Sequence, residues 1–190
     1  MKNTHTTNSF TGRAIGATFF AGFGALWLFL SLIARQLLSV ISIFWVLGGL
    51  ALLLAGAAYL FQEAKRFPAV PSDPAKGRAF TWINAIQWIV VSILAVTFAK
   101  FHIEAYIMSA ITAVVGLHMF PLARLFRYPL HYASGAVLVL WAVASVVLVP
   151  LEQLQGITAL GTGIILWLSA AVTLALAWQA VRISAEPLPQ

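Results

Sequence analysis

Long apolar stretches recur along the chain, with almost no charged residue inside them. Six such segments cover residues 12–34, 37–61, 80–99, 105–122, 132–149 and 157–181. An α-helix rises about 1.5 Å per residue, so each segment is roughly long enough to cross a hydrocarbon core about 30 Å thick. Uninterrupted apolar runs lack the alternation of a membrane β-barrel, and unpaired backbone groups are costly in lipid. The pattern therefore predicts an all-α, polytopic transmembrane helical bundle of six spans, forming a single domain over residues 1–190.

The composition excludes an ordinary soluble domain. Hydrophobic residues make up 62% of the chain and charged residues only 8%, whereas soluble domains are about 45–50% apolar and about 25% charged. The net charge of +6 raises the question of nucleic-acid binding. However, the basic residues lie between apolar segments and form no basic face, so we expect no nucleic-acid partner. The predicted environment is the lipid bilayer, and the absence of cysteine excludes thiolate chemistry.

Lysine and arginine are distributed unevenly between alternate connections. If the N-terminus is cytoplasmic, the opposite side holds only Arg35 and Lys100, and the cytoplasmic side holds Lys2, Arg13, Lys65, Arg66, Lys76, Arg78, Arg124, Arg127 and Arg182. Cytoplasmic loops carry such an excess. We therefore predict that both termini are cytoplasmic in a multi-pass protein of the cell membrane, in a bacterium the inner membrane. The longest connection, residues 62–79, contains three prolines and is expected to be an irregular cytoplasmic loop.

Three polar side chains inside the apolar segments are the candidate site. Asn84 and Gln87 belong to one segment, and His118 to the next. Amide and ionisable groups are costly in lipid, so they usually face a partner or a cavity. All three fall at a similar depth on the cytoplasmic side of two antiparallel spans. We predict that His118 lies within hydrogen-bond reach of Asn84 or Gln87, directly or through water, as an interhelical clamp or as part of a solute or ion pathway.

Other features predict packing rather than chemistry. Glycines are expected to allow close contact between helices of one chain, or between copies of it; they are Gly12, Gly16, Gly22, Gly24, Gly156, Gly161 and Gly163. The deep tryptophans are expected to pack or to face lipid, with an aromatic cage as the alternative; they are Trp27, Trp45, Trp88, Trp141 and Trp167. His102 and Glu104 are expected to be solvated turn residues. No motif indicates a catalytic residue, a metal site or a cofactor.

Residues 116–135 read GLHMFPLARLFRYPLHYASG. This segment resembles one found in a family of small, uncharacterised bacterial integral membrane proteins that cross the membrane several times. The resemblance covers about a tenth of the chain. It implies a bacterial inner-membrane setting, and it brings with it no activity, cofactor or site residue.

These observations predict an integral membrane protein whose activity is small-solute transport or binding at His118, Asn84 and Gln87. The alternative is a structural or accessory membrane subunit, docked on another membrane protein or on a second copy of the chain. A third hypothesis is an intramembrane enzyme that uses His118 or His102. The sequence leaves the solute, any coupling ion and the oligomeric state open.

Overall fold

The structure, a computed structural model, describes residues 7–66 and 73–185. Six α-helices account for most of them: α1 (Thr7–Ala34), α2 (Val40–Ala64), α3 (Pro74–Lys100), α4 (Ile107–Phe126), α5 (Leu130–Leu148) and α6 (Leu151–Ala185). A short 3-10 helix, η1 (Glu104–Tyr106), precedes α4. No strand occurs in the described ranges. All six helices are long and apolar enough to cross a membrane, which confirms the predicted all-α architecture of six apolar helices.

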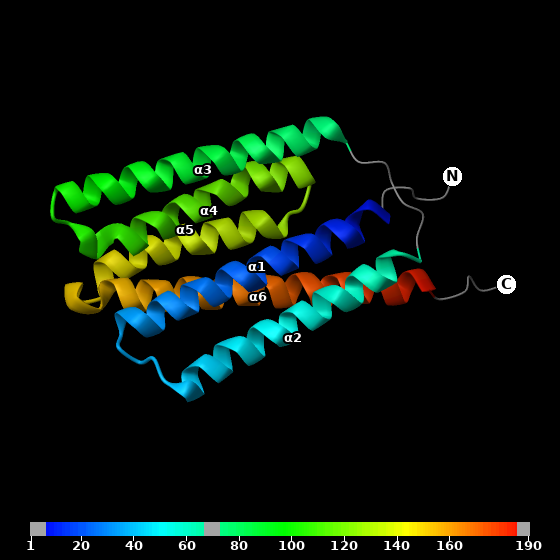
Figure 1. The fold of residues 1–190 in the computed structure, drawn as a ribbon. Helices are drawn as coiled ribbons and strands as arrows, with labels where there is room; N and C mark the ends of the chain where they lie inside the picture. Colours follow the sequence, from blue (N-terminus) through cyan, green and yellow to red (C-terminus); the bar gives the residue numbers. More distant parts are fainter. Residues whose placement is uncertain (1–6, 67–72, 186–190) are drawn as a thin grey trace.

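Consecutive helices run in alternating directions (Figure 1). The described ends of the chain lie at the same end of the bundle as the last turn of α2, the first turn of α3 and the α4–α5 turn; we call this the termini end. The α1–α2, α3–α4 and α5–α6 connections lie at the opposite end. The most extensive packing joins α1 to α6 and α4 to α5, whereas α2 packs on α1 and α6, and α3 packs mainly on α4.

Buried side chains come mainly from α1, α4, α5 and α6. Helix α3 has no buried residue and α2 has four. Large apolar side chains of these two helices point outward, as Trp45 and Trp82 do with exposed fractions of 77% and 70%. Such surfaces suit acyl chains. The bundle therefore has a four-helix core, flanked by two peripheral helices.

Two pairs of glycines allow the core helices to cross closely. A Cβ atom on Gly135 of α5 would lie 2.6 Å from the carbonyl oxygen of Gly116 in α4. A Cβ on Gly163 of α6 would lie 2.9 Å from the carbonyl oxygen of Gly24 in α1. Any larger residue would push the backbones apart. Glycine therefore determines the spacing of both helix pairs.

The other glycines selected from the sequence divide into two groups. Gly156 packs beneath the side chain of Arg35, and Gly161 beneath the indole of Trp141. Nothing lies within 4 Å of a Cβ built on Gly12, Gly16 or Gly22. The prediction of packing within the chain therefore holds for the glycines of α6 and for Gly24, whereas the other three glycines of α1 face open space.

The connection predicted at residues 62–79 is shorter than expected. Helix α3 begins at Pro74, where the carboxylate of Asp73 accepts a hydrogen bond of 2.9 Å from the amide of Ala75. Proline favours the first turn of a helix, because the amide it lacks would have no helical partner there. A proline taken as a loop signal therefore starts a helix. Residues 67–72 of the predicted loop lie outside the described residues.

Helix α6 also begins earlier than predicted. Residues 150–156, between two predicted spans, are expected to form a turn, but Glu152, Gln153 and Gln155 occupy the first turns of the helix, which starts at Leu151 directly after Pro150. An acidic side chain near a helix N-terminus is favourable because of the helix dipole. Polar residues therefore extend this helix beyond its apolar stretch.

Candidate functional site

A row of buried hydroxyl groups follows α6 on the face turned toward α4 and α5. Four come from α6 at spacings of four, seven and four residues, which keeps them on one side of the helix: Thr158, Thr162, Ser169 and Thr173. Four more come from α4 and α5: Ser109, Thr112, Ser134 and Ser145. All eight are buried, with exposed fractions of 7% or less. We call these eight residues the hydroxyl seam.

Hydrogen bonds of the seam join different helices. Near the opposite end, Thr112 Oγ1 lies 2.8 Å from Thr162 Oγ1, and Ser109 Oγ lies 3.2 Å from the hydroxyls of both Ser145 and Thr158. Each such bond contributes about 0.6 kcal/mol on average in a membrane protein. The seam therefore holds α4, α5 and α6 together with satisfied polar groups.

The seam continues toward the termini end after an apolar break. Ser134 and Ser169 lie 2.8 Å apart, and the hydroxyl of Tyr128 donates a bond of 3.3 Å to Thr173. Between the two halves stand Leu138 and Leu166, which are 0% and 1% exposed. These leucines separate the two groups of hydroxyls, so the seam forms no continuous polar path across the bundle.

A cluster of ionisable and aromatic side chains lies where the seam reaches the termini end. The guanidinium carbon of Arg13 lies 5.6 Å from the centre of the Tyr128 ring. The ring of His131 meets Tyr128 edge to face at 5.1 Å and Phe20 at 5.5 Å. His118 is close enough to His131 to interact with it electrostatically. We call Arg13, His118, Tyr128 and His131 the arginine–histidine cluster.

The α4–α5 turn positions two members of this cluster. Helix α4 ends at Phe126, and Arg127 adopts a left-handed backbone with φ of 51°. This reverses the chain, so that the amide of Tyr128 donates to the carbonyl of Ala123 at 3.1 Å. Pro129 then occupies the N-cap position directly before α5, because its fixed φ suits a helix start. The short turn thus keeps Tyr128 and His131 close to each other at the end of the core.

Two polar atoms of the cluster are buried without a partner. His131 is 8% exposed, and its Nδ1 has no hydrogen bond in the described structure. The Nε of Arg13 is likewise buried without a hydrogen-bond partner. Leaving a buried polar group unsatisfied costs about 1–3 kcal/mol, and ionisable groups within a membrane often mark functional sites. The cluster is therefore the strongest candidate site in the described part of the chain.

The polar site predicted from the sequence is arranged differently. Asn84 donates through Nδ2 to the carbonyl of Phe80, one turn earlier in its own helix, at 2.8 Å. No hydrogen bond among the described residues joins His118 to Asn84 or Gln87, although all three are half-buried. The predicted direct hydrogen bond is therefore not formed. A contact bridged by water stays a prediction.

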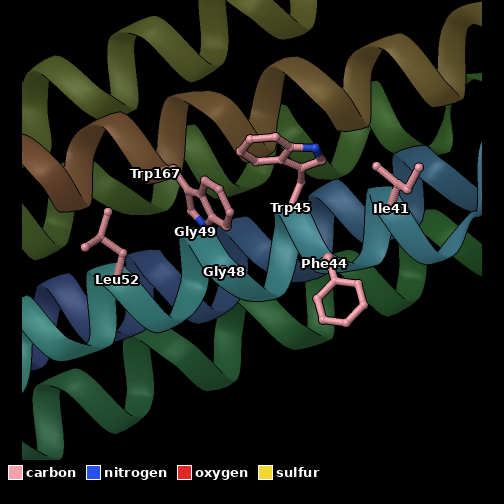
Figure 2. Close-up of a pocket in the computed structure, with 7 residues that line it drawn as sticks. All are labelled: Ile41, Phe44, Trp45, Gly48, Gly49, Leu52 and Trp167. Atoms are coloured by element: carbon pink, nitrogen blue, oxygen red, sulfur yellow. The ribbon is translucent and has the colours of Figure 1, made fainter.

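The deep tryptophans do not gather into one cage. Trp27 is buried and Trp88 is 55% exposed on α3. Trp167 donates through Nε1 to the carbonyl of Ala21 in α1 at 3.0 Å, and its ring lies against Gly49 of α2. Together with Trp45 it borders a groove of about 610 Å³ between α2 and α6, shown in Figure 2; the lining residues are Ile41, Phe44, Trp45, Gly48, Gly49, Leu52 and Trp167. The lining is almost entirely apolar, so the groove favours an apolar ligand over a polar solute.

Comparison with protein-family models, with curated proteins and with solved structures finds no match to the chain. The functional proposal therefore rests on the chemistry of the arginine–histidine cluster. Of its members, the sequence selected only His118 as a site residue. The hydroxyl seam had a visible signal in the spacing of Thr158, Thr162, Ser169 and Thr173. No comparable sequence signal connects Arg13 with His131.

Proposed function

We propose that the protein is a multi-pass protein of the bacterial inner membrane that binds a small solute at the arginine–histidine cluster. The observation that supports this proposal is the pair of buried, unpartnered atoms, Arg13 Nε and His131 Nδ1, on side chains that both contact Tyr128. A ligand that satisfies both atoms would remove an existing energetic cost. Binding at this place is therefore favoured over binding at the apolar grooves.

The distribution of charge supports a cytoplasmic position for the cluster. Of the ten described lysines and arginines, eight lie toward the termini end; the other two are Arg35, directly after α1, and Lys100, the last residue of α3. The side with more lysine and arginine is usually cytoplasmic. A reporter fused after Gln190 should therefore report cytoplasm, and one inserted next to Lys100 should report the opposite side. The reverse result would place the cluster outside the cytoplasm.

This conformation supports the binding of a solute from one side of the bundle, which is the first step of transport. Leu138 and Leu166 fill the core beyond the cluster and close it from the opposite end. A solute that reaches His131 from the termini end would therefore stop there. Passage across the membrane would require these two leucines to separate.

Single cysteines can test whether water reaches the cluster, because the chain has no cysteine of its own. Thr173→Cys places a thiol of similar size beside Tyr128. Thr162→Cys is the matched control, on the same face of α6 beyond Leu166 and equally buried. In inverted membrane vesicles, a water-soluble maleimide should label the cysteine at 173 at least tenfold faster than the one at 162. Equal labelling rates would overturn the proposed solute site.

A second candidate function is that of an accessory subunit, and the open glycines of α1 favour it. A groove of about 230 Å³ lies along this helix, lined by Thr18, Phe19, Gly22, Phe23 and Leu26. A helix of another membrane protein can approach closely over glycine. An accessory subunit should copurify with a defined larger protein, and Gly22→Leu should abolish the association without unfolding the bundle. Survival of the association in this variant would exclude docking at α1.

A further inference from the structure

The charges around the arginine–histidine cluster are predominantly positive. Two described acidic residues lie at the termini end, and each pairs with a basic residue three positions later in the chain. Glu63 lies 3.1 Å from Arg66, and Asp73 lies 4.0 Å from Lys76. Among the described residues, no carboxylate pairs with Arg13. The cluster therefore has a cation without a counter-charge.

The cluster also offers more hydrogen-bond donors than acceptors. An arginine side chain has five N–H donors and no acceptor. The hydroxyl proton of Tyr128 is already donated to Thr173. The Nδ1 of His131 is unpartnered and can donate when it carries the proton. A cationic solute would be repelled here, whereas an oxyanion can accept hydrogen bonds from both residues.

We infer that the cluster binds an oxyanion, a carboxylate or phosphate group, through Arg13 and His131; this inference rests on the proposed solute-binding function. The guanidinium of Arg13 lies over the Tyr128 ring, whose negative face is a weak substitute for an anion. The bound oxyanion takes the place of the ring and accepts a hydrogen bond from Arg13 Nε. The same chemistry is available from a free anion in the cytoplasm and from the phosphate of an anionic lipid.

Thermal unfolding of the full-length protein in nanodiscs tests the inference and separates these two sources. The first arm uses phosphatidylcholine nanodiscs with added sodium phosphate or sodium acetate, against sodium chloride at the same ionic strength. The second arm adds phosphatidylglycerol to the nanodiscs and no free oxyanion. Ligand binding to the folded state alone raises the unfolding temperature. We expect a rise of at least 3 °C in one arm.

Three variants show whether the rise depends on the cluster. Arg13→Gln removes the charge, and His131→Phe keeps the ring contacts with Phe20 and Tyr128 but removes Nδ1. Both should lose the rise. Arg124→Gln, at an exposed arginine of the same end, should keep it. The unfolding temperature of each variant without anion reports whether its fold is intact.

The outcomes distinguish the inference from the function on which it rests. A rise with free phosphate or acetate identifies a soluble ligand, and a rise with phosphatidylglycerol alone identifies a lipid headgroup. The oxyanion assignment is overturned if the unfolding temperature rises in neither arm. It is also overturned if Arg13→Gln and Arg124→Gln lose this rise equally. If maleimide still labels the cysteine at 173 faster than the one at 162, the solute site stands and its ligand is of another class. If that labelling difference is also absent, both proposals fail.

Discussion

The close crossing of α4 and α5 predicts a large effect for Gly135→Ala. A Cβ atom at this position would lie 2.6 Å from the carbonyl oxygen of Gly116 and 2.9 Å from Cβ of Met119. Ordinary contacts begin near 3.4 Å, so one methyl group would require the two helices to separate by about 0.8 Å. The oxygen belongs to a helix backbone, which cannot rotate away as a side chain does.

The cost of this change can be estimated from overpacked cores. One extra methyl group in a well-packed core typically costs about 1–3 kcal/mol. We expect Gly135→Ala to fall near the upper part of this range, since the obstructing atom is backbone and Leu138, one turn later in α5, is fully buried. The same displacement would shift His131, one turn earlier, relative to Phe20. The rise in unfolding temperature caused by an oxyanion should therefore be smaller in this variant, in addition to its loss of stability.

Reversible unfolding in mixed micelles, followed by tryptophan fluorescence against the fraction of SDS, measures this free energy. Gly22→Ala is the matched control, because nothing lies within 4 Å of its Cβ. There the methyl group meets no neighbour, and alanine is a better helix former than glycine by up to about 1 kcal/mol. The control should therefore be neutral or slightly stabilising. Equal unfolding free energies for the two variants would refute the close crossing as the determinant of α4–α5 spacing.

Two further variants test polar contacts between core helices. Thr162→Val removes the hydroxyl that lies 2.8 Å from Thr112 Oγ1 and leaves the Thr112 hydroxyl buried without that partner. Unfolding in SDS should show that the free energy of unfolding falls by about 0.6–1.7 kcal/mol. An unchanged free energy would mean that the seam does not clamp the helices. Trp167→Phe removes the 3.0 Å hydrogen bond to the Ala21 carbonyl and should lower the free energy of unfolding by about 0.5–1.5 kcal/mol in the same assay. Trp45→Phe, at a side chain that is 77% exposed, should lower it by less.

Local sequence determines where the helices are, because a span of given length must satisfy its backbone in lipid by forming a helix. All six spans were predicted on that ground. Their ends were harder to place, because the helices continue beyond their apolar stretches into polar sequence. Pro74 and Glu152 illustrate this: each appeared to belong to a connection, and each lies in the first turn of a helix.

The contacts between helices follow from the tertiary structure alone. In a soluble protein the apolar face of a helix identifies its buried side, but in a membrane both the lipid and the core are apolar. Hydropathy therefore cannot show that α1 packs on α6 while α3 stays at the periphery. The glycine crossings and the interhelical hydroxyl bonds decide this, and they depend on pairs of residues from different spans.

The candidate site shows the same division. The sequence identified His118 as costly in lipid. The spacing of Thr158, Thr162, Ser169 and Thr173 is enough to place four hydroxyls on one face of α6, but it was not among the predictions. Arg13 and His131, however, are 118 positions apart. They meet around Tyr128 because α1, which packs mainly on α6, reaches His131 through Phe20, and the left-handed turn at Arg127 returns the chain to the core. Charge and polarity are properties of single residues, whereas a cation and a buried imidazole come to contact the same aromatic ring only when separate helices pack.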